Sequence, residues 1–183
     1  AGNACSQTGK PLTRFETLID QHHDEIYRYL WRLVGCRSGA DGAIEIDDLA
    51  QEVFMRAYHA IDRLPAGSNT RAWLYRIATN CAYSAFKRSR RMQNTVALFE
   101  ETDQLVSAAP TPDQRVAAAA ALDALGNALR ELPPKQQAAL IMRYLDEMAY
   151  TEIAEALGCS EDSARANVYQ ALRRLRRELT EEV

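Results

Sequence analysis

Apolar residues recur every three or four positions along most of the chain, a spacing that predicts amphipathic α-helices. The stripe of the first predicted helix consists of Phe15, Leu18, Ile19, His22, Ile26, Tyr29, Leu30 and Leu33. No alternating run of β-branched residues is long enough to predict a strand. The pattern therefore predicts an all-α protein.

The second and third predicted helices differ in their polar faces. The second opens at Asp47 or Asp48, and Asp48 with Gln51 three residues later forms a variant of the capping box. The third helix runs from about Thr70 to Arg91. Its polar seam, at three- and four-residue spacing, is Arg76, Asn80, Tyr83, Lys87 and Arg90. We therefore expect the third helix to present a basic, aromatic face to the exterior.

Composition divides the chain into two predicted helical domains. After the third helix, acids, alanines, serines and two prolines replace the helical pattern, which is typical of an interdomain linker. Helical periodicity resumes downstream over 116–132, 135–145, 151–157 and 161–179. The predicted organisation is a disordered N-terminus (1–11), a first domain (12–92), a flexible acidic linker (93–112) and a second domain (113–183).

Basic residues are concentrated in two blocks, although the formal net charge of the chain is −3. Seven Lys or Arg residues and no acid occur between Arg63 and Phe99, and five Arg and no acid between Ala164 and Arg177. A protein that needed charge only for solubility would mix both signs. The two blocks therefore indicate two separate contacts with a polyanion such as nucleic acid.

Several functional classes are excluded or unsupported. No apolar run approaches the roughly 18 residues that span a bilayer, and the N-terminus is not a secretory signal, so we expect a cytoplasmic protein without membrane insertion. The four cysteines are scattered without a CxxC pair, which predicts neither a zinc site nor a disulfide framework. No paired carboxylates or nucleophile–base set occurs at an interpretable spacing. We expect no catalytic residue, no metal and no cofactor.

A helix-turn-helix pattern occupies the second half of the last domain. Ile153, Ala154 and Leu157 are predicted to pack inward, Gly158 to make the sharp turn, and Ser160 to cap the next helix. The outward positions of that helix are Arg165, Ala166, Tyr169, Gln170 and Arg173. A major groove admits such a helix, and Arg and Gln side chains can pair with guanine and adenine there. The alternative is an ordinary helical hairpin with a solvated basic surface.

Three passages resemble one bacterial family, the RNA polymerase sigma factors of the extracytoplasmic-function (ECF) group. They are DDLAQEVFMRAY (47–58), RAWLYRIATNCAYSAFKRSRR (71–91) and the segment from LPPKQQ through ALRRLR (132–176). The order of the passages is similar to the order in that group: a region 2 domain, a linker, and a region 4 domain with a helix-turn-helix. The resemblance covers nearly all of the chain except residues 1–11 and the linker.

The resemblance assigns a role to each exposed face. The second helix would dock on the clamp helices of the largest polymerase subunit through Asp48, Gln51, Glu52, Met55 and Arg56. The third helix would read and open the −10 promoter element through Arg76, Asn80, Tyr83, Lys87, Arg88, Arg90 and Arg91. The last helix would read the −35 element through Arg165, Ala166, Tyr169, Gln170, Arg173 and Arg174. Without the resemblance, a solvated polar face remains an alternative for the second helix.

The resemblance also implies partners and leaves one competing function. The expected partners are core RNA polymerase, including the flap of its second-largest subunit, promoter DNA and an anti-sigma factor. Asp162-Ser163, Ala166-Asn167 and Gln170 depart from residues frequent in the family, so no −35 sequence is inferred from them. The competing function is a stand-alone regulator that binds duplex operators as a dimer. The block from Arg63 to Phe99 favours the sigma factor, because a duplex-only binder has no use for it.

Overall fold

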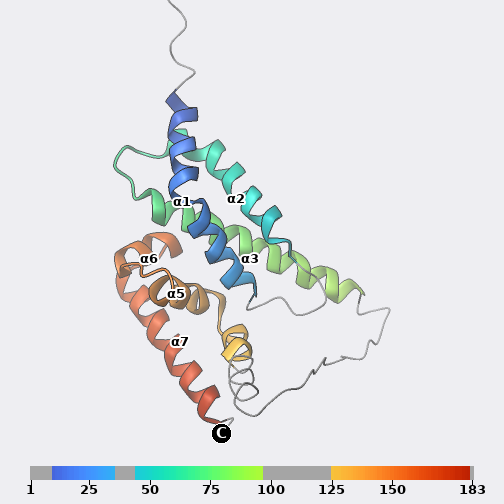
Figure 1. Cartoon of the computed structure of the whole chain (residues 1–183). Coiled ribbons are helices and arrows are strands. Elements are labelled where there is room, and N and C mark those ends of the chain that lie inside the picture. The colour runs from blue at the N-terminus through green and yellow to red at the C-terminus, as the bar shows by residue number, and fades with distance from the viewer. Residues whose placement is uncertain (1–9, 36–43, 97–124, 182–183) are drawn as a thin grey trace, which may run out of the picture.

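The computed structural model describes residues 10–35, 44–96 and 125–181. These residues form helices and their connections, with no strand among them, so the predicted all-α fold is confirmed for this part of the chain. The helices gather into an N-terminal lobe and a C-terminal lobe (Figure 1). In the same ranges no helix is long and apolar enough to cross a membrane.

The N-terminal lobe consists of α1 (Lys10–Gly35), α2 (Ile46–Ala60), the short 3-10 helix η1 (Ile61–Arg63) and α3 (Thr70–Val96). Its core contains Leu30 and Leu33 from the predicted stripe of the first helix, together with Val53 of α2 and Leu74 of α3, and all four are fully buried. A polar pair also lies inside: the Tyr29 hydroxyl is 2.7 Å from the hydroxyl of Thr79. This hydrogen bond compensates the desolvation of both groups.

The predicted capping box at the start of α2 is wrong. The helix begins two residues earlier than Asp48, and its N-cap is Glu45, whose side chain makes no capping hydrogen bond. Ile44 and Ile46 pack against the core, and this packing fixes the start of the helix before Asp48. Asp47 and Asp48 instead occupy the first turn, where negative charge is favoured by the helix dipole, and Asp47 accepts a 2.9 Å hydrogen bond from the Tyr27 hydroxyl.

The C-terminal lobe consists of a helical stretch over 125–131 followed by α5 (Pro134–Tyr144), α6 (Tyr150–Leu157) and α7 (Glu161–Glu181). Pro134 opens α5 at a position where a missing N–H costs nothing. The core of the lobe contains Leu132, Met142, Met148, Ile153 and Val168. All five side chains are buried, so this small lobe has an apolar centre of its own.

The connection between α6 and α7 is the predicted helix-turn-helix turn. Gly158 adopts the left-handed conformation with φ 61° and ψ 47°, which ends α6. The N–H of Cys159 then bonds to the carbonyl of Ala154 at 3.0 Å. Ser160 caps α7 by accepting a 3.2 Å hydrogen bond from the N–H of Ser163. The roles predicted for Gly158 and Ser160 are both confirmed.

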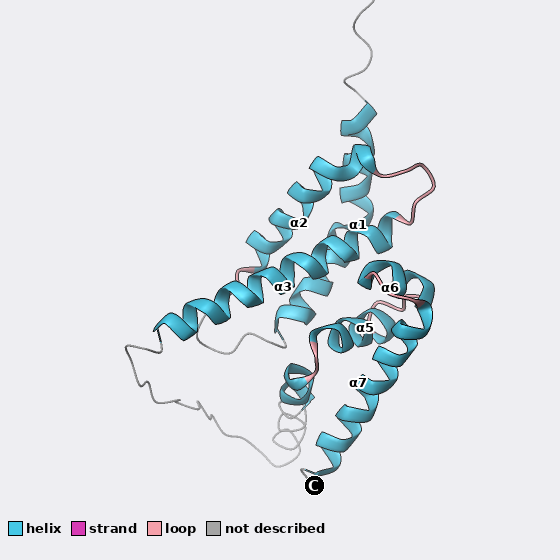
Figure 2. Cartoon of the chain, turned by 180° about the vertical axis from the view of Figure 1, so that it is seen from behind, coloured by secondary structure: helices cyan, strands magenta, loops and turns pink. Residues whose placement is uncertain are grey.

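The two lobes lie against each other. In the C-terminal lobe, α6 packs on α3 and α5 packs on α1 (Figures 1 and 2). Relative to the predicted boundaries, α1 begins at Lys10, inside the predicted disordered segment, and α3 continues to Val96, into the predicted linker. The rest of that linker, and the predicted helix over 116–132 up to residue 124, lie outside the described residues.

An ion pair joins α1 to α3 within the N-terminal lobe. Glu25 accepts a hydrogen bond from Arg71 Nε at 2.7 Å and from the Tyr75 hydroxyl at 3.2 Å, and lies 3.4 Å from His22 Nδ1. Burial acts to raise the pKa of Glu25, but the hydrogen bonds from His22 and Arg71, the charge of Arg71 and the Tyr75 hydroxyl lower it to about 2. The charged form of Glu25 is therefore the one that stabilises the fold.

This lowered pKa predicts an acid-dependent contribution to stability. The free energy of unfolding contributed by Glu25 is present above its ordinary pKa of 4.5 and is lost as the pH falls toward about 2. We expect Glu25→Gln to destabilise the protein most at neutral pH, and progressively less as the pH falls below that ordinary pKa. Urea unfolding of both proteins at a series of pH values measures this difference, and a difference independent of pH would contradict the assignment.

The left-handed turn predicts a position-specific glycine requirement. In Gly158→Ala, the new Cβ would lie 3.6 Å from an Arg76 guanidinium nitrogen, an ordinary contact, so the cost comes from the backbone. We expect a loss of about 1 kcal/mol in the free energy of unfolding. Gly126→Ala is the matched control, because that glycine is helical with open space around it. The control should stabilise the protein by up to about 1 kcal/mol in urea unfolding.

Candidate nucleic-acid interface

The basic face of α3 is exposed at most of its predicted positions. Arg76, Asn80, Lys87, Arg88 and Arg91 are all exposed, and no acidic residue lies on this helix. Arg90 belongs to the same helix, but its side chain lies outside those the structure describes. Arg76, Asn80 and Lys87 are separated by roughly one or two helical turns, so they follow one side of the helix. This side can meet the phosphates of a nucleic acid strand.

Tyr83 does not belong to that exposed face, contrary to the prediction. Its ring packs against the core, and its hydroxyl oxygen is buried. Burial raises the pKa of Tyr29 on α1, and the nearby Tyr83 hydroxyl raises it further. Tyr83 therefore lies on the side of α3 that faces α1. Helical spacing put Tyr83 in line with Asn80, but a bulky ring gains more from half-burial between helices than from full exposure.

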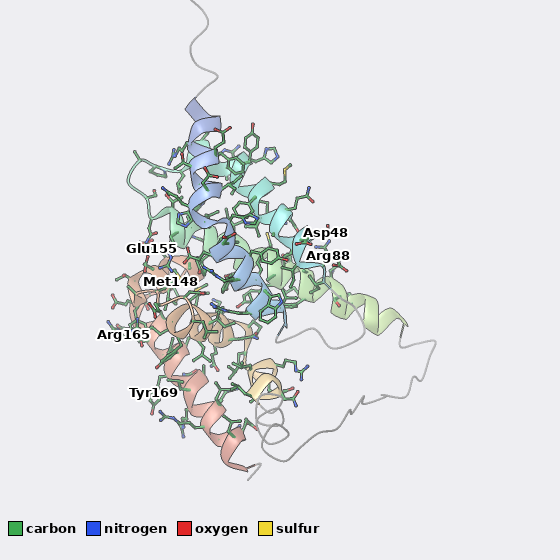
Figure 3. All side chains as sticks on the ribbon, in the orientation of Figure 1. Asp48, Arg88, Met148, Glu155, Arg165 and Tyr169 are labelled. Carbon is green, nitrogen blue, oxygen red and sulfur yellow. The ribbon has the colours of Figure 1, made fainter. Side chains whose placement is uncertain are left out.

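The outward face of α7 is exposed as predicted. Arg165, Ala166, Tyr169, Gln170, Arg173 and Arg174 are all exposed on the side of α7 away from the core. Tyr169 is 67% exposed, which leaves most of the ring available for contact with a ligand. In Figure 3, Tyr169 and Arg165 lie along the outer edge of the C-terminal lobe. The opposite side of the helix is held in place by four buried positions, Ala164, Val168, Ala171 and Leu175.

Arg165 is held by neighbours that the sequence pattern did not identify. Its guanidinium lies 4.5 Å from the centre of the Tyr150 ring, and Arg143 lies 4.8 Å from the same ring. Arg165 also pairs with Glu161, one turn earlier on α7. The cation–π contact and the ion pair restrict the orientation of Arg165 before any ligand binds. The only sequence signal was an aromatic residue opening the first helix of the helix-turn-helix.

Gln170 is exposed but engaged with α5. Gln136 donates a 2.7 Å hydrogen bond to the side-chain oxygen of Gln170. Reading a base edge with Gln170 therefore requires exchanging this bond for one to the base. The two cationic residues beyond it, Arg173 and Arg174, have exposed side chains that can reach phosphates.

The exposed face of α2 differs in character from the two basic faces. Asp48, Gln51, Met55 and Arg56 are exposed, and Glu52, which is half-buried, pairs with Arg56 at 2.5 Å. Met55 is 52% exposed and Tyr58, about one turn away, is 42% exposed. This mixture of polar groups around exposed apolar side chains is typical of protein–protein contacts. Tyr58 was missed because a tyrosine at that position fits a core pattern as well as a surface one.

In the observed arrangement, the labelled residues of the α7 face lie away from those of the α2 and α3 faces (Figure 3). In Figure 3, Asp48 and Arg88 lie on the side of the molecule opposite Arg165 and Tyr169. The α3 face begins at Arg76, whose guanidinium lies close to Gly158 in the turn between α6 and α7. The helix-turn-helix therefore sits against the start of the α3 face.

The described residues contain no cluster of three or more His, Cys, Asp or Glu side chains arranged to hold a metal ion. Cys81 and Cys159 are free thiols, and burial raises the pKa of Cys81 to about 11. Cys5 and Cys36 lie outside the described residues. Cys81 is thus an inert core residue.

Two known families match the two lobes. Residues 18–92 match the family described as Sigma-70 region 2, and residues 122–175 match the family described as Sigma-70, region 4. The first range contains the α2 face and all but the last turn of α3, and the second contains the helix-turn-helix.

Individual relatives match this chain over most of its length. The ECF RNA polymerase sigma factor SigL of Mycobacterium tuberculosis is 32% identical over 170 residues, covering 90% of this chain and 88% of SigL. The ECF RNA polymerase sigma factor BldN of Streptomyces coelicolor is 31% identical over 170 residues, covering 92% of this chain. This chain spans 61% of BldN, less than two thirds of its length.

The fold is also that of a solved sigma factor. The sigma factor RpoE from Bartonella quintana, in its complex with the anti-sigma factor NepR, superposes with a TM-score of 0.65 at 24% identity, covering 92% of this chain and 98% of RpoE. The two family matches place a region 2 lobe before a region 4 helix-turn-helix lobe. This chain belongs to the extracytoplasmic-function group of bacterial RNA polymerase sigma factors.

Proposed function

We propose that this sigma factor binds core RNA polymerase through α2, the −10 promoter element through α3 and the −35 element through α7, and thereby starts DNA melting. The observation that carries the proposal is the separation of chemistry among three exposed faces. Two are basic with aromatic or amide groups, and the third is mixed polar and apolar. The polymerase performs the chemistry of RNA synthesis, in the cytoplasm, and the sigma factor selects where it begins.

The α3 face supplies the groups that melted DNA requires. The amide of Asn80 can hydrogen-bond to an unstacked base edge, while Lys87, Arg88 and Arg91 can neutralise phosphates of the same strand. With Tyr83 half-buried, base recognition on this face relies on Asn80 and not on stacking. Arg90 is assigned to the phosphates from its position on the helix.

The α7 face supplies the groups that duplex DNA requires. Arg165, preset by Tyr150, is suited to bidentate contact with guanine in a major groove, and Tyr169 to packing on thymine methyl groups. The same surface is completed by Ala166, Gln170, Arg173 and Arg174. A stand-alone duplex regulator would also use this face. It would leave the exposed α2 and α3 faces without a partner, so the sigma assignment accounts for more of the surface.

Two further assignments follow from the family. The α2 face of Asp48, Gln51, Glu52, Met55 and Arg56 would dock on the clamp helices of the largest polymerase subunit, and the C-terminal lobe on the flap of the second-largest. The solved RpoE structure contains the anti-sigma factor NepR, and an anti-sigma partner is proposed for this chain on that basis. The domain boundaries 12–92 and 113–183 are proposed as the units that carry these contacts.

The α2 assignment predicts a selective loss of polymerase binding. Met55→Asp places a charge at the most exposed apolar position of the face, where it must be desolvated on docking. We expect the affinity for core polymerase, measured by fluorescence anisotropy, to fall about tenfold or more, with a matching loss of promoter-directed transcription in vitro. Asp62→Ala on η1 is the control and should change neither. Failure of the unmodified protein to bind core would reject the sigma function.

The α3 assignment predicts a loss of promoter melting without a loss of polymerase binding. In Asn80→Ala combined with Lys87→Ala, one base contact and one phosphate contact are removed without touching the core of the lobe. We expect open-complex formation, followed by permanganate reactivity of the melted strand, to fall about tenfold or more while affinity for core polymerase stays unchanged. A loss of core binding in this double variant would show that the α3 face has been assigned to the wrong partner.

A further inference from the structure

The contacts between the lobes centre on the loop that joins α5 to α6. Asp146 in this loop lies against α1 and α3, and its side chain is only 4% exposed. Arg32 on α1 donates to Asp146 Oδ1 at 2.6 Å and to the carbonyl of Leu145 at 3.2 Å. Both of these hydrogen bonds cross from one lobe to the other.

A second arginine bridges the lobes from α3. Arg71, which pairs with Glu25 inside its own lobe, also donates to the carbonyl of Asp146 at 2.7 Å. Its other terminal nitrogen lies 3.6 Å from a carboxylate oxygen of Glu152 on α6. Because the donors of a guanidinium lie in one plane, these three partners together fix the orientation of the side chain. One guanidinium thus connects α1, α3, the α5–α6 loop and α6.

The junction also covers the beginning of the α3 face. Asn69, which caps α3 by accepting a 3.1 Å hydrogen bond from the N–H of Ala72, donates to Glu152 at 3.3 Å. Arg76 follows two turns later and lies against Gly158. In this arrangement, groups at the start of the −10 face are engaged by the C-terminal lobe.

The buried carboxylate of Asp146 makes the junction depend on Arg32. Burial raises the pKa of Asp146 to about 6, and this is opposed by the charges of Arg32 and Arg71, while the charge of Glu25 raises it further. Arg32, 2.6 Å from Oδ1, is the cation that balances this buried carboxylate. Removing the partner of a buried charge is strongly destabilising.

The observed arrangement is too compact for both promoter elements. Their names place the −10 and −35 elements about 25 base pairs apart, roughly 85 Å along B-form DNA at about 3.4 Å per pair. At about 1.5 Å per residue, Arg91 lies roughly 23 Å along α3 from Arg76, and Arg174 lies roughly 20 Å along α7 from its start. With Arg76 against Gly158, the two faces cannot reach both elements at once.

We propose that Arg32, Arg71, Asp146 and Glu152 form an interlobe latch that holds the free sigma factor closed and that core polymerase must open. The proposal rests on the proposed function, because the closed form is inactive only if α3 and α7 bind the two elements. Polymerase binds the open form, so its apparent dissociation constant is the intrinsic constant divided by the open fraction. A weaker latch therefore gives tighter binding to polymerase.

The test compares Arg32→Ala with Arg28→Ala. The two hydrogen bonds of Arg32 cross the junction, whereas Arg28 is an exposed arginine one turn earlier that lines the same surface hollow beside Asp146. We expect small-angle X-ray scattering of the full free chain to give a larger radius of gyration for Arg32→Ala than for the unmodified protein. Its affinity for core polymerase should rise about tenfold, and Arg28→Ala should match the unmodified protein in both measurements.

A second variant distinguishes opening of the lobes from misfolding of the protein. Asn69→Asp keeps an N-cap for α3, since Asp caps as well as Asn, but turns a carboxylate toward Glu152. It should also enlarge the radius of gyration while the helical circular dichroism stays unchanged. Unchanged dimensions and unchanged core affinity in both variants would overturn the latch, and so would weaker core binding by Arg32→Ala.

The two proposals fail in different ways. If the unmodified protein does not bind core polymerase, the proposed function is wrong, and scattering still decides whether the lobes separate in the variants. If it binds core and drives transcription but neither variant opens, the latch is wrong and the function stands.

Discussion

The structure depends on helices that bury apolar side chains on one side and keep charged side chains in water on the other. α3 buries Leu74, Ala78 and Cys81, which hold the N-terminal lobe together, and leaves in water the basic face that we propose binds DNA. A helix resolves this conflict because residues three or four apart share a side. The same division repeats on α7, where the buried side supports a row of exposed cations.

Helical periodicity was sufficient to predict the helices, the two lobes and most exposed positions. Gly158 and Ser160 were also predictable, because turn and capping chemistry is local in sequence. Tyr83 was misplaced because periodicity gives a direction around the helix but not the depth of the neighbouring packing. The cap at Asp48 failed for a related reason: the helix start is set by packing of Ile44 and Ile46.

Contacts between distant residues could not be predicted from spacing. Arg32 and Asp146 are 114 residues apart in the chain, and Asn69 and Glu152 are 83 apart. In the sequence, Arg71 looked like one more cation of the basic block, yet the structure uses it to join four elements. A charge run therefore contains two kinds of residue, those that face a ligand and those that hold the protein together, and only packing separates them.

Acidic residues form ion pairs with some of the exposed arginines that are assigned to partners. Glu161 pairs with Arg165 and Glu52 with Arg56, so cations assigned to partners already have an anion nearby. Binding then exchanges one ionic contact for another, which lowers the net gain in affinity and increases selectivity for partners that offer several contacts at once. With the proposed latch, polymerase binds only the open lobes, and an inhibitor could bind only the closed lobes. By linkage, each of the two then weakens the binding affinity of the other by the same factor. An inhibitor that spans both lobes would need no overlap with the α2 face to exclude polymerase.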